Sequence, residues 1–448
     1  MHLIRIKEYG ILLDCGLIQT GADIYTNYKL NQAQLKKIKP NDIQYIILSH
    51  SHIDHVGLVP ALIAQGCQAH IYVPKGSLPF LKLLWEDSMK IFTADCQKIE
   101  RKHGQKATPF YTQSDINNTL NRCIEVPYYT NQPLFDEDNY FKYYDAGHII
   151  HSAQIYLNLL IDENIVKRIG YTGDIGGNPY NPQPWSGKRN ELPFVDILIG
   201  ENTYNSPVRP NKPYDRRVDN QKIINVIEES NKVLIPCFSL MRTQIMLSNL
   251  LHLWEENKIP KGTQIYVDSP LAEKFCRIWP ESYMWDFIMN EWPNLHFIKE
   301  WSESVELQKS NEKCVIISAS GFLSGGRVVS HLKTVLPYDK NTILFCGFSG
   351  ENNLASQIKS KQKEVVVDGE SIPNRANIVE LHSFSSHASY EDLIQYYTHS
   401  TTRFNKLCLV HGNQQNKIEF AKVLQEELSS NGISSKVVAI NNDTKMNF

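Results

Sequence analysis

The sequence lacks the features of a membrane or secreted protein. Its longest apolar stretches fall well short of the roughly 18 residues that a membrane span needs. The start, Met1-His2-Leu3-Ile4-Arg5-Ile6, has no apolar core of a secretion signal. The nine cysteines are odd in number, scattered and without a C-x-x-C pair, which argues against a disulfide framework. We therefore expect a reduced, cytoplasmic protein with no membrane partner.

Charge of one sign is also not in excess. The formal net charge is −2, and 42% of residues are hydrophobic and 21% charged, as in ordinary globular proteins. Nucleic-acid binding would therefore need a local basic groove. At 448 residues the chain exceeds what one core usually organises, so we expect two domains or one domain with a large insertion.

What the sequence does have is a dense cluster of ligand-type side chains, His50-Ser51-His52-Ile53-Asp54-His55. It follows the apolar run 43–48, which is typical of a buried strand delivering a loop. Imidazole nitrogen and carboxylate oxygen are ligands that a divalent ion such as zinc takes. The alternative is a solvated polar loop, but a core strand that ends in four ionisable residues favours a metal site.

Other predicted strands end in similar residues. Asp14 ends an apolar run at 11–13, and Asp145-Ala146-Gly147-His148 follows a run at 140–144. Asp174 and His411 follow two further strands. Each residue alone is more often a turn or capping residue. Because strands of one sheet bring their ends together, their joint occurrence with the cluster at 50–55 favours one shared site.

The pattern of predicted elements changes along the chain. The first part alternates short strands and turns with one long helix predicted over 78–101. From about 205 to 368, predicted strands at 232–236, 264–267, 314–318, 342–346 and 364–367 alternate with helices, which indicates a parallel sheet in an α/β domain. A third region again carries histidines. We therefore expect a catalytic domain in two sequence pieces, 1–204 and 373–448, with an inserted α/β domain at 205–372.

These motifs resemble a known family. The segment 50–55 with His148 and Asp174 is similar to the metallo-β-lactamase superfamily pattern. The segments 240–244, 268–272, 384–387 and 409–412 resemble the β-CASP branch of that superfamily, which holds bacterial and archaeal ribonucleases and the nuclease subunit of the mRNA 3′-end processing complex. The resemblance covers essentially the whole chain and is nearest to short, stand-alone bacterial RNA-processing members. It implies an αββα sandwich with an inserted parallel-sheet domain.

The resemblance also implies two metal ions, expected to be Zn²⁺ with Mn²⁺ or Fe²⁺ as alternatives. It assigns one ion to His50, His52 and His148. It assigns the other to Asp54, His55 and His411. Asp174 bridges both ions, and Asp14 matches a position that orients ligands without binding metal itself.

Two further positions match a hydrogen-bonded acid and histidine in the family, Glu201 and His387. With Asp54 they are the expected catalytic residues. His387 is the candidate general acid, with Glu201 raising its basicity and fixing its tautomer. The alternatives are a structural histidine at 387 and a strand-end turn residue at 201.

Arg242 and Arg327 are the expected phosphate contacts on RNA. Next to Arg327, Gly325-Gly326 before a helix would let backbone N–H groups approach an anion. A domain–domain salt bridge is the alternative for either arginine. Ser269 and Ser320 have weaker support as RNA contacts.

The chain also departs from the family pattern. Family members normally carry a strand before the stretch matching His2-Leu3-Ile4, so we expect the first strand to be missing. His151 stands where a glycine is usual, and Ser389 replaces an acid.

The resemblance therefore implies a zinc-dependent ribonuclease that cleaves single-stranded RNA by a two-metal mechanism. His411 points to RNA, since members acting on DNA tend to carry an apolar residue there. The alternatives are a small-molecule metallo-hydrolase, a DNA-directed nuclease and an inactive RNA-binding subunit. A homodimer stays open as the assembly.

Overall fold

The computed structural model describes residues 1–20, 23–176, 189–206, 215–280, 282–323, 325–347, 353–441 and 444–445. The chain forms two compact units. The first unit comprises Met1–Gln19, Ile24–Asn211 and Ser386–Phe448, and the second comprises Thr20–Asp23 and Lys212–Ser385. Among the described residues, no helix combines the length and the apolar character that crossing a membrane requires.

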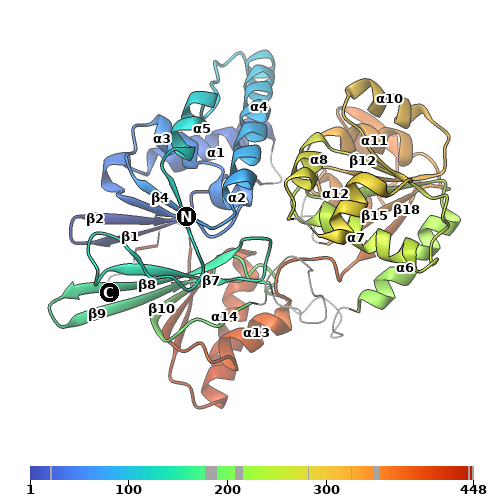
Figure 1. Ribbon diagram of the computed structural model, residues 1–448. Coiled ribbons are helices and arrows are strands. Elements are labelled where there is room, and N and C mark those ends of the chain that lie inside the picture. Colours follow the sequence, from blue (N-terminus) through green and yellow to red (C-terminus); the bar gives the residue numbers. More distant parts are fainter. Residues whose placement is uncertain are drawn as a thin grey trace. The chain divides into compact units, whose positions relative to one another are not determined.

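One sheet of the first unit has five strands in the order β1-β2-β3-β4-β5. Its strands are β1 (His2–Ile6), β2 (Tyr9–Leu13), β3 (Tyr45–Ile47), β4 (His70–Pro74) and β5 (Cys123–Val126). β2 to β5 run parallel, and β1 pairs antiparallel with β2 at the edge. The outer face is covered by α1 (Ile24–Lys36), α3 (Val59–Ala64), α4 (Leu78–His103) and α5 (Gln113–Leu120), as Figure 1 shows.

The other sheet of the first unit has seven strands in the order β20-β19-β10-β9-β8-β7-β6. Its strands are β6 (Gln132–Pro133), β7 (Tyr140–Asp145), β8 (Ala153–Asp162), β9 (Ile165–Tyr171), β10 (Val195–Glu201), β19 (Phe404–Val410) and β20 (Lys436–Ala439). Helices α13 (Tyr390–Thr398) and α14 (Gln414–Ser430) cover its outer face (Figure 1). The first unit is thus an αββα sandwich, which confirms the predicted fold class.

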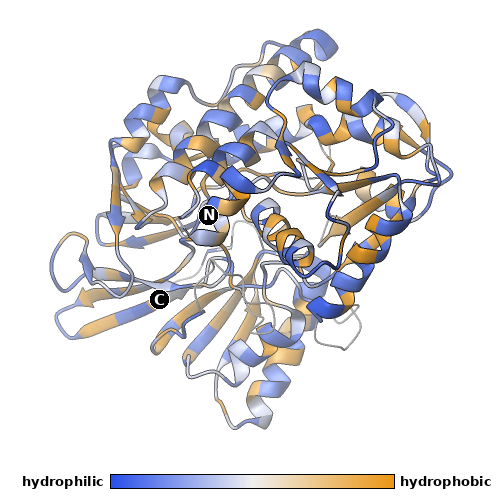
Figure 2. Cartoon of the chain, turned by 45° about the vertical axis from the view of Figure 1, so that its right-hand side comes forward, coloured by the Kyte–Doolittle hydropathy of each residue, from blue (hydrophilic) through white to orange (hydrophobic). Residues whose placement is uncertain are grey.

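Alternation of apolar side chains explains the sandwich. In β2, Ile11 and Leu13 join the core between the two sheets, whereas Leu12 joins the core under the helices. Successive side chains of a strand point to opposite faces, so a strand buried on both sides reads as a continuous apolar run. Figure 2 shows hydrophobic and hydrophilic residues interspersed along both the strands and the helices.

The second unit holds a six-stranded parallel sheet in the order β13-β12-β14-β11-β15-β18. Its strands are β11 (Lys232–Pro236), β12 (Gln264–Asp268), β13 (Leu295–Phe297), β14 (Cys314–Ser318), β15 (Thr342–Cys346) and β18 (Asn377–Leu381). Its longer helices are α6 (Arg216–Glu229), α7 (Arg242–Glu255), α8 (Pro270–Arg277), α10 (Trp301–Lys309), α11 (Arg327–Val335) and α12 (Leu354–Lys359). Shorter helical segments in the chain are η1 (Pro40–Asp42), α2 (Ile53–Val56), α9 (Tyr283–Asp286) and η2 (Phe287–Glu291).

One predicted strand does not join this sheet. The segment Glu364–Val367 forms β16, which pairs antiparallel with β17 (Glu370–Pro373) as a separate two-stranded sheet. The parallel partner of β15 is instead β18. A two-residue connection, Asp368-Gly369, with both residues at positive φ closes the β16–β17 hairpin, and this turn type keeps the two strands adjacent.

Candidate metal centre

Strand ends of both sheets in the first unit converge on one set of ionisable side chains. Asp14 follows β2, and the loop 48–55 follows β3, which runs parallel to β2. In the other sheet β9, β10 and β19 are parallel neighbours, so Asp174, Glu201 and His411 come from the same edge. β7 is antiparallel to β8, and β8 to β9, so the loop that carries His148 starts at that edge too.

Close backbone approach fixes the loops at this edge. A Cβ atom on Gly16 would lie 1.5 Å from the carbonyl oxygen of Asp54, so only glycine fits where the 14–16 turn meets the loop 50–55. Asp14 and His411 both have positive φ, at 55° and 66°. Non-glycine residues held in this conformation are uncommon and concentrate at functional sites.

Three imidazoles and one carboxylate form the first cluster, which we call the three-histidine group. It consists of His50, His52, His148 and Asp174. The Nδ1 atom of His52 lies 3.2 Å from Nε2 of His50 and 3.2 Å from Nε2 of His148. Oδ2 of Asp174 is 3.7 Å and 3.8 Å from those two Nε2 atoms. Ligand nitrogens at about 2.0–2.1 Å from a tetrahedral zinc ion are about 3.3 Å apart, so these spacings fit one metal ion.

A second cluster shares Asp174, and we call it the mixed group. It consists of Asp54, His55, Asp174 and His411. Nε2 of His55 lies 3.4 Å from Oδ2 of Asp174 and 3.8 Å from Oδ2 of Asp54. Nε2 of His411 lies 3.5 Å from the same Asp54 oxygen. The structure thus brings together all seven residues that the sequence assigned to metal binding.

Two atoms of this centre are buried without a hydrogen-bond partner among the described residues. They are Nε2 of His55 and Oδ1 of Asp174. A buried polar atom without a partner costs free energy, so native proteins rarely leave one unsatisfied. Nε2 of His55 lies among the clustered ligand atoms, and imidazole and carboxylate are metal ligands, so the residues fit a metal cofactor.

The histidine nitrogens that face away from the clusters are held in place. His55 Nδ1 lies 2.7 Å from Oδ2 of Asp14, and His148 Nδ1 lies 3.1 Å from the backbone oxygen of Ser386. Ser49 donates its hydroxyl to Asp14 at 2.7 Å and lies 3.0 Å from Nδ1 of His50. Such partners fix ring orientation and tautomer.

Asp14 is the centre of this outer layer. Besides Ser49 and His55, it accepts a hydrogen bond from the hydroxyl of Tyr171 at 2.8 Å. Ser49 and Tyr171 were not singled out from the sequence. Neither is a metal ligand type in this pattern, and only the fold shows that Tyr171, 157 residues from Asp14, reaches it.

The pKa values of the two groups move in opposite directions. Burial lowers the pKa of His50 and His148 well below the ordinary value and that of His52 to about 4. Burial acts in the same direction on His55, but Asp174, Asp54 and Asp14 outweigh it and raise the pKa of His55 well above the ordinary value. For His411, Asp174 and Asp54 likewise outweigh burial and raise the pKa. Without a metal, the neutral imidazole is thus favoured in the three-histidine group and the protonated imidazole in the mixed group.

An acid–histidine pair lies beside the centre. Nδ1 of His387 is 3.5 Å from Oε2 of Glu201 and 3.9 Å from Oδ2 of Asp174. Burial opposes protonation, but Glu201 outweighs it and raises the pKa of His387 to about 9. Oε1 of Glu201 accepts a hydrogen bond from the backbone N–H of Ile175 at 2.5 Å. A histidine held protonated at neutral pH can act as a general acid.

The residues that depart from the family pattern have local partners. The ring of His151 packs against the backbone of Gly76 and lies 5.8 Å from the ring of Phe80. Ser389 is the N-cap of α13, where its hydroxyl accepts from the N–H of Asp392 at 3.1 Å and donates to that carboxylate at 2.8 Å. Ser389 therefore stabilises the start of the helix that follows His387.

The predicted RNA contacts all lie in the second unit. Arg327 donates to Oδ1 of the buried Asp268 at 2.7 Å and to the backbone oxygens of Ile298 and Lys299. Its guanidinium is thus engaged in a salt bridge within its own unit, which differs from the domain–domain salt bridge given as the alternative. The guanidinium of Arg242 lies 5.1 Å above the ring of Phe238, and no described carboxylate forms an ion pair with it.

The two predicted serines are also placed by the structure. Ser269 caps α8 by accepting from the N–H of Ala272 at 3.2 Å, and its hydroxyl lies 3.2 Å from that of Ser239. The backbone N–H of Ser320 donates to the oxygen of Gly325 at 3.4 Å. The RNA-binding roles of these serines and of both arginines stay predictions.

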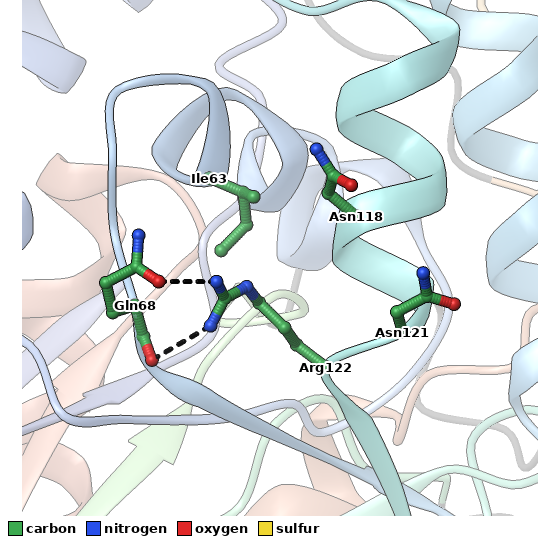
Figure 3. A pocket seen from close by; sticks show the side chains of 5 residues that line it. All are labelled: Ile63, Gln68, Asn118, Asn121 and Arg122. Atoms are coloured by element: carbon green, nitrogen blue, oxygen red, sulfur yellow. Dashed lines mark hydrogen bonds between the residues drawn. The ribbon is translucent and has the colours of Figure 1, made fainter.

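A pocket of about 350 Å³ lies elsewhere in the first unit (Figure 3). Its lining is Ile63, Gln68, Asn118, Asn121 and Arg122. These residues come from α3, α5 and the segments that precede β4 and β5, whereas the metal centre follows the opposite ends of parallel strands. Arg122 donates to both oxygens of Gln68, so its charge is engaged there.

Three family models match successive parts of the chain. The metallo-β-lactamase superfamily matches residues 1–107, and the β-CASP domain matches residues 243–358. The zinc-dependent metallo-hydrolase RNA specificity domain matches residues 371–435. The first match contains the loop 50–55, and the third contains His387 and His411.

Curated relatives match nearly the whole chain. A ribonuclease of Thermus thermophilus is 25% identical over 94% of this chain and 92% of its own length. An RNase J-like protein of Methanocaldococcus jannaschii is 27% identical over 95% of this chain and 92% of its own length. Integrator complex subunit 11 of Danio rerio is 26% identical over 95% of this chain and 69% of its own length.

Proposed function

The chain belongs to the β-CASP branch of the metallo-β-lactamase superfamily, and on that premise we propose that it is a zinc-dependent ribonuclease. It hydrolyses phosphodiester bonds of single-stranded RNA in RNA processing or decay, in the cytoplasm. The observation that carries this proposal is the pair of ligand groups that share Asp174 beside the Glu201–His387 pair. The RNA specificity match and the relatives named as ribonucleases support RNA as the substrate.

We assign one Zn²⁺ to the three-histidine group and one to the mixed group. Two bound divalent cations lower the pKa of a water molecule toward neutrality and offset the negative charge of the phosphodiester. The neutral imidazoles of the three-histidine group and the shared carboxylate supply ligands of the type zinc takes. Mn²⁺ and Fe²⁺ take the same ligand types and stay the alternatives.

His387 supplies the proton that the departing ribose oxygen needs. Its raised pKa keeps the imidazole ring protonated at neutral pH, and Glu201 stabilises that charge at 3.5 Å from Nδ1. After the proton leaves, Glu201 favours its return from solvent, since a nearby carboxylate stabilises the imidazolium. The side chain of His387 is 18% exposed, which leaves it accessible to a substrate.

Asp54 has a second task beside binding metal. Its side chain is 42% exposed, and His55 and His411 outweigh the effect of burial and lower its pKa. An ionised carboxylate at the open side of the mixed group can accept a hydrogen bond from the attacking water and orient it. Of the two arginines predicted to contact phosphate, Arg242 is the more available, because Arg327 is engaged with Asp268.

One assay separates this function from its alternatives. A 5′-labelled single-stranded RNA, a DNA of the same sequence and a chromogenic β-lactam are each incubated with the zinc-loaded protein, with and without chelator. We expect cleavage of RNA alone, lost on chelation. We expect His387→Ala to cut at least about 100-fold more slowly while it retains its zinc, and the control His399→Ala, on an exposed residue at the end of α13, to cut normally. Cleavage of DNA or of the lactam, or cutting by His387→Ala at the wild-type rate, would refute the proposal.

A further inference from the structure

One hydroxyl group links the metal ligand His411 to the acid–histidine pair. Thr203 follows Glu201 by two residues at the end of β10, and its side chain is half-buried. Its Oγ1 donates to Oε2 of Glu201 at 2.6 Å and lies 2.8 Å from Nδ1 of His411. The backbone N–H of Thr203 donates to the same Glu201 oxygen at 3.3 Å. Thr203 is therefore held against Glu201 by two bonds while it contacts His411.

The directions of these hydrogen bonds follow from the groups involved. An ionised carboxylate only accepts, and a hydroxyl has a single hydrogen. Because the Thr203 hydrogen goes to Glu201, Oγ1 must accept at its other contact, so Nδ1 of His411 carries a hydrogen. In the neutral ring, Nε2 is then left without a hydrogen. Nε2 is the atom that lies 3.5 Å from Asp54 in the mixed group.

The same arrangement occurs once more in this centre. Ser49 donates to Asp14 at 2.7 Å and lies 3.0 Å from Nδ1 of His50. By the same reasoning His50 carries its hydrogen on Nδ1 and presents a bare Nε2 to the three-histidine group. The two relays differ in their carboxylate. Asp14 contacts His55, another metal ligand, whereas Glu201 contacts His387.

We propose that Thr203 is a positioning residue that sets the tautomer of His411 for metal binding and couples this ligand to Glu201, the carboxylate beside His387. Only the His387 part rests on the proposed ribonuclease function. Without the hydroxyl, His411 loses the acceptor for Nδ1–H and can rotate or change tautomer, and Glu201 loses the hydroxyl donor at 2.6 Å. Removing such an outer partner of a ligand typically weakens metal binding about 10–100-fold.

The test uses the metal-free full-length chain titrated with Co²⁺, whose visible absorption reports each ion as it binds. Thr203→Val keeps the shape of the side chain and removes the hydroxyl, and Thr203→Ser keeps the hydroxyl. Thr119→Val is the matched control, since Thr119 is buried in α5 and its hydroxyl donates to the backbone oxygen of Asp115. If Thr203→Val does not fold, Thr203→Ala takes its place with the same expectations.

We expect wild type, Thr203→Ser and Thr119→Val to bind two Co²⁺ ions with matching affinities. Thr203→Val should bind the first ion normally and the second about 10–100-fold more weakly. Unchanged affinity for the second ion in Thr203→Val, or failure of Thr203→Ser to restore it, would overturn the proposal. RNA cleavage is measured on the same samples. Wild type that binds two ions and cuts no RNA would refute the ribonuclease function, while the Co²⁺ titration would still decide the tautomer role of Thr203.

Discussion

The two groups of the candidate metal centre share the carboxylate of Asp174 but differ in exposure and in the direction of their histidine pKa shifts. In the three-histidine group, the side chains of His50 and His148 are fully buried and their pKa values are lowered by burial. In the mixed group, Asp54 and His411 are 42% and 36% exposed, and the pKa of His411 is raised by its carboxylate neighbours in spite of burial. One half is therefore ready for a cation without releasing protons, and the other must exchange protons for its metal.

This contrast gives the halves different tasks. A buried site of neutral imidazoles suits an ion that stays in place. The more open mixed group contains His411, which contacts Thr203, and Thr203 in turn donates to Glu201 of the proposed acid–histidine pair. We therefore propose that the three-histidine group holds its ion more firmly than the mixed group, which lies beside the proposed general acid.

The largest effect on metal binding and RNA cleavage should come from replacing Asp174, which belongs to both groups. Asp174→Asn replaces the carboxylate that the two groups share with a neutral amide of the same shape. We expect both ions to bind more weakly and RNA cleavage to fall at least about a thousandfold, equivalent to about 4 kcal/mol of transition-state stabilisation. Metal content after gel filtration and single-turnover cleavage rates provide the check. A variant that keeps both ions and cuts RNA normally would show that the two groups are independent.

Lowering the pH should weaken metal binding at the mixed group before it affects the three-histidine group. His55 and His411, with raised pKa values, hold protons that metal must displace, so affinity at the mixed group falls as the pH drops from about 8 to about 5. His52, with a pKa of about 4, and its two neighbours hold no such protons in that range. Zinc content at a fixed free concentration should fall from two ions to one.

The His411→Ala variant identifies which ion leaves. Because its mixed group is disabled, this variant should bind one zinc ion at every pH in the range. Loss of that remaining ion at the same pH as the first would contradict the contrast between the two groups.

A smaller effect is expected from Glu201→Gln. His387 acts in its protonated form, so the rate is lost as the pH rises through the pKa of His387. Glu201 holds this pKa at about 9, and a neutral glutamine should lower it by about one unit or more. The alkaline limb of the kcat profile should then move to lower pH, with metal content nearly unchanged. An unmoved limb would assign the alkaline pKa to another group.

The sequence predicted the metal centre better than its surroundings. His50, His52, Asp54 and His55 lie in one loop, so a spacing pattern predicted that they cluster. This loop follows a strand of one sheet, whereas His148, Asp174 and His411 follow strands of the other, so their meeting depends on the sandwich and not on one shared sheet edge. The αββα sandwich was predicted from the resemblance to the metallo-β-lactamase superfamily. Ser49, Tyr171 and Thr203 were missed, because a hydroxyl gains its role only from a partner that is distant in sequence, such as His411, 208 residues from Thr203.

In the second unit, too, the sequence does not show which distant segment or side chain a residue will pair with. An apolar run such as Glu364–Val367 reads equally well as a parallel strand or as half of a hairpin, and only the pairing with β17 decides. Arg327 reads as a phosphate contact next to two glycines, yet the buried carboxylate of Asp268 is its partner. A buried charge needs a counter-charge, and the sequence does not show which residue supplies it.

The most direct test of a dinuclear centre built from two unlike halves is anomalous X-ray diffraction at the zinc edge from crystals of the zinc-loaded protein. We expect two peaks about 3.5–4 Å apart, one among His50, His52 and His148 and one among Asp54, His55 and His411, with Asp174 between them. A single peak, or none between these imidazoles, would contradict the account.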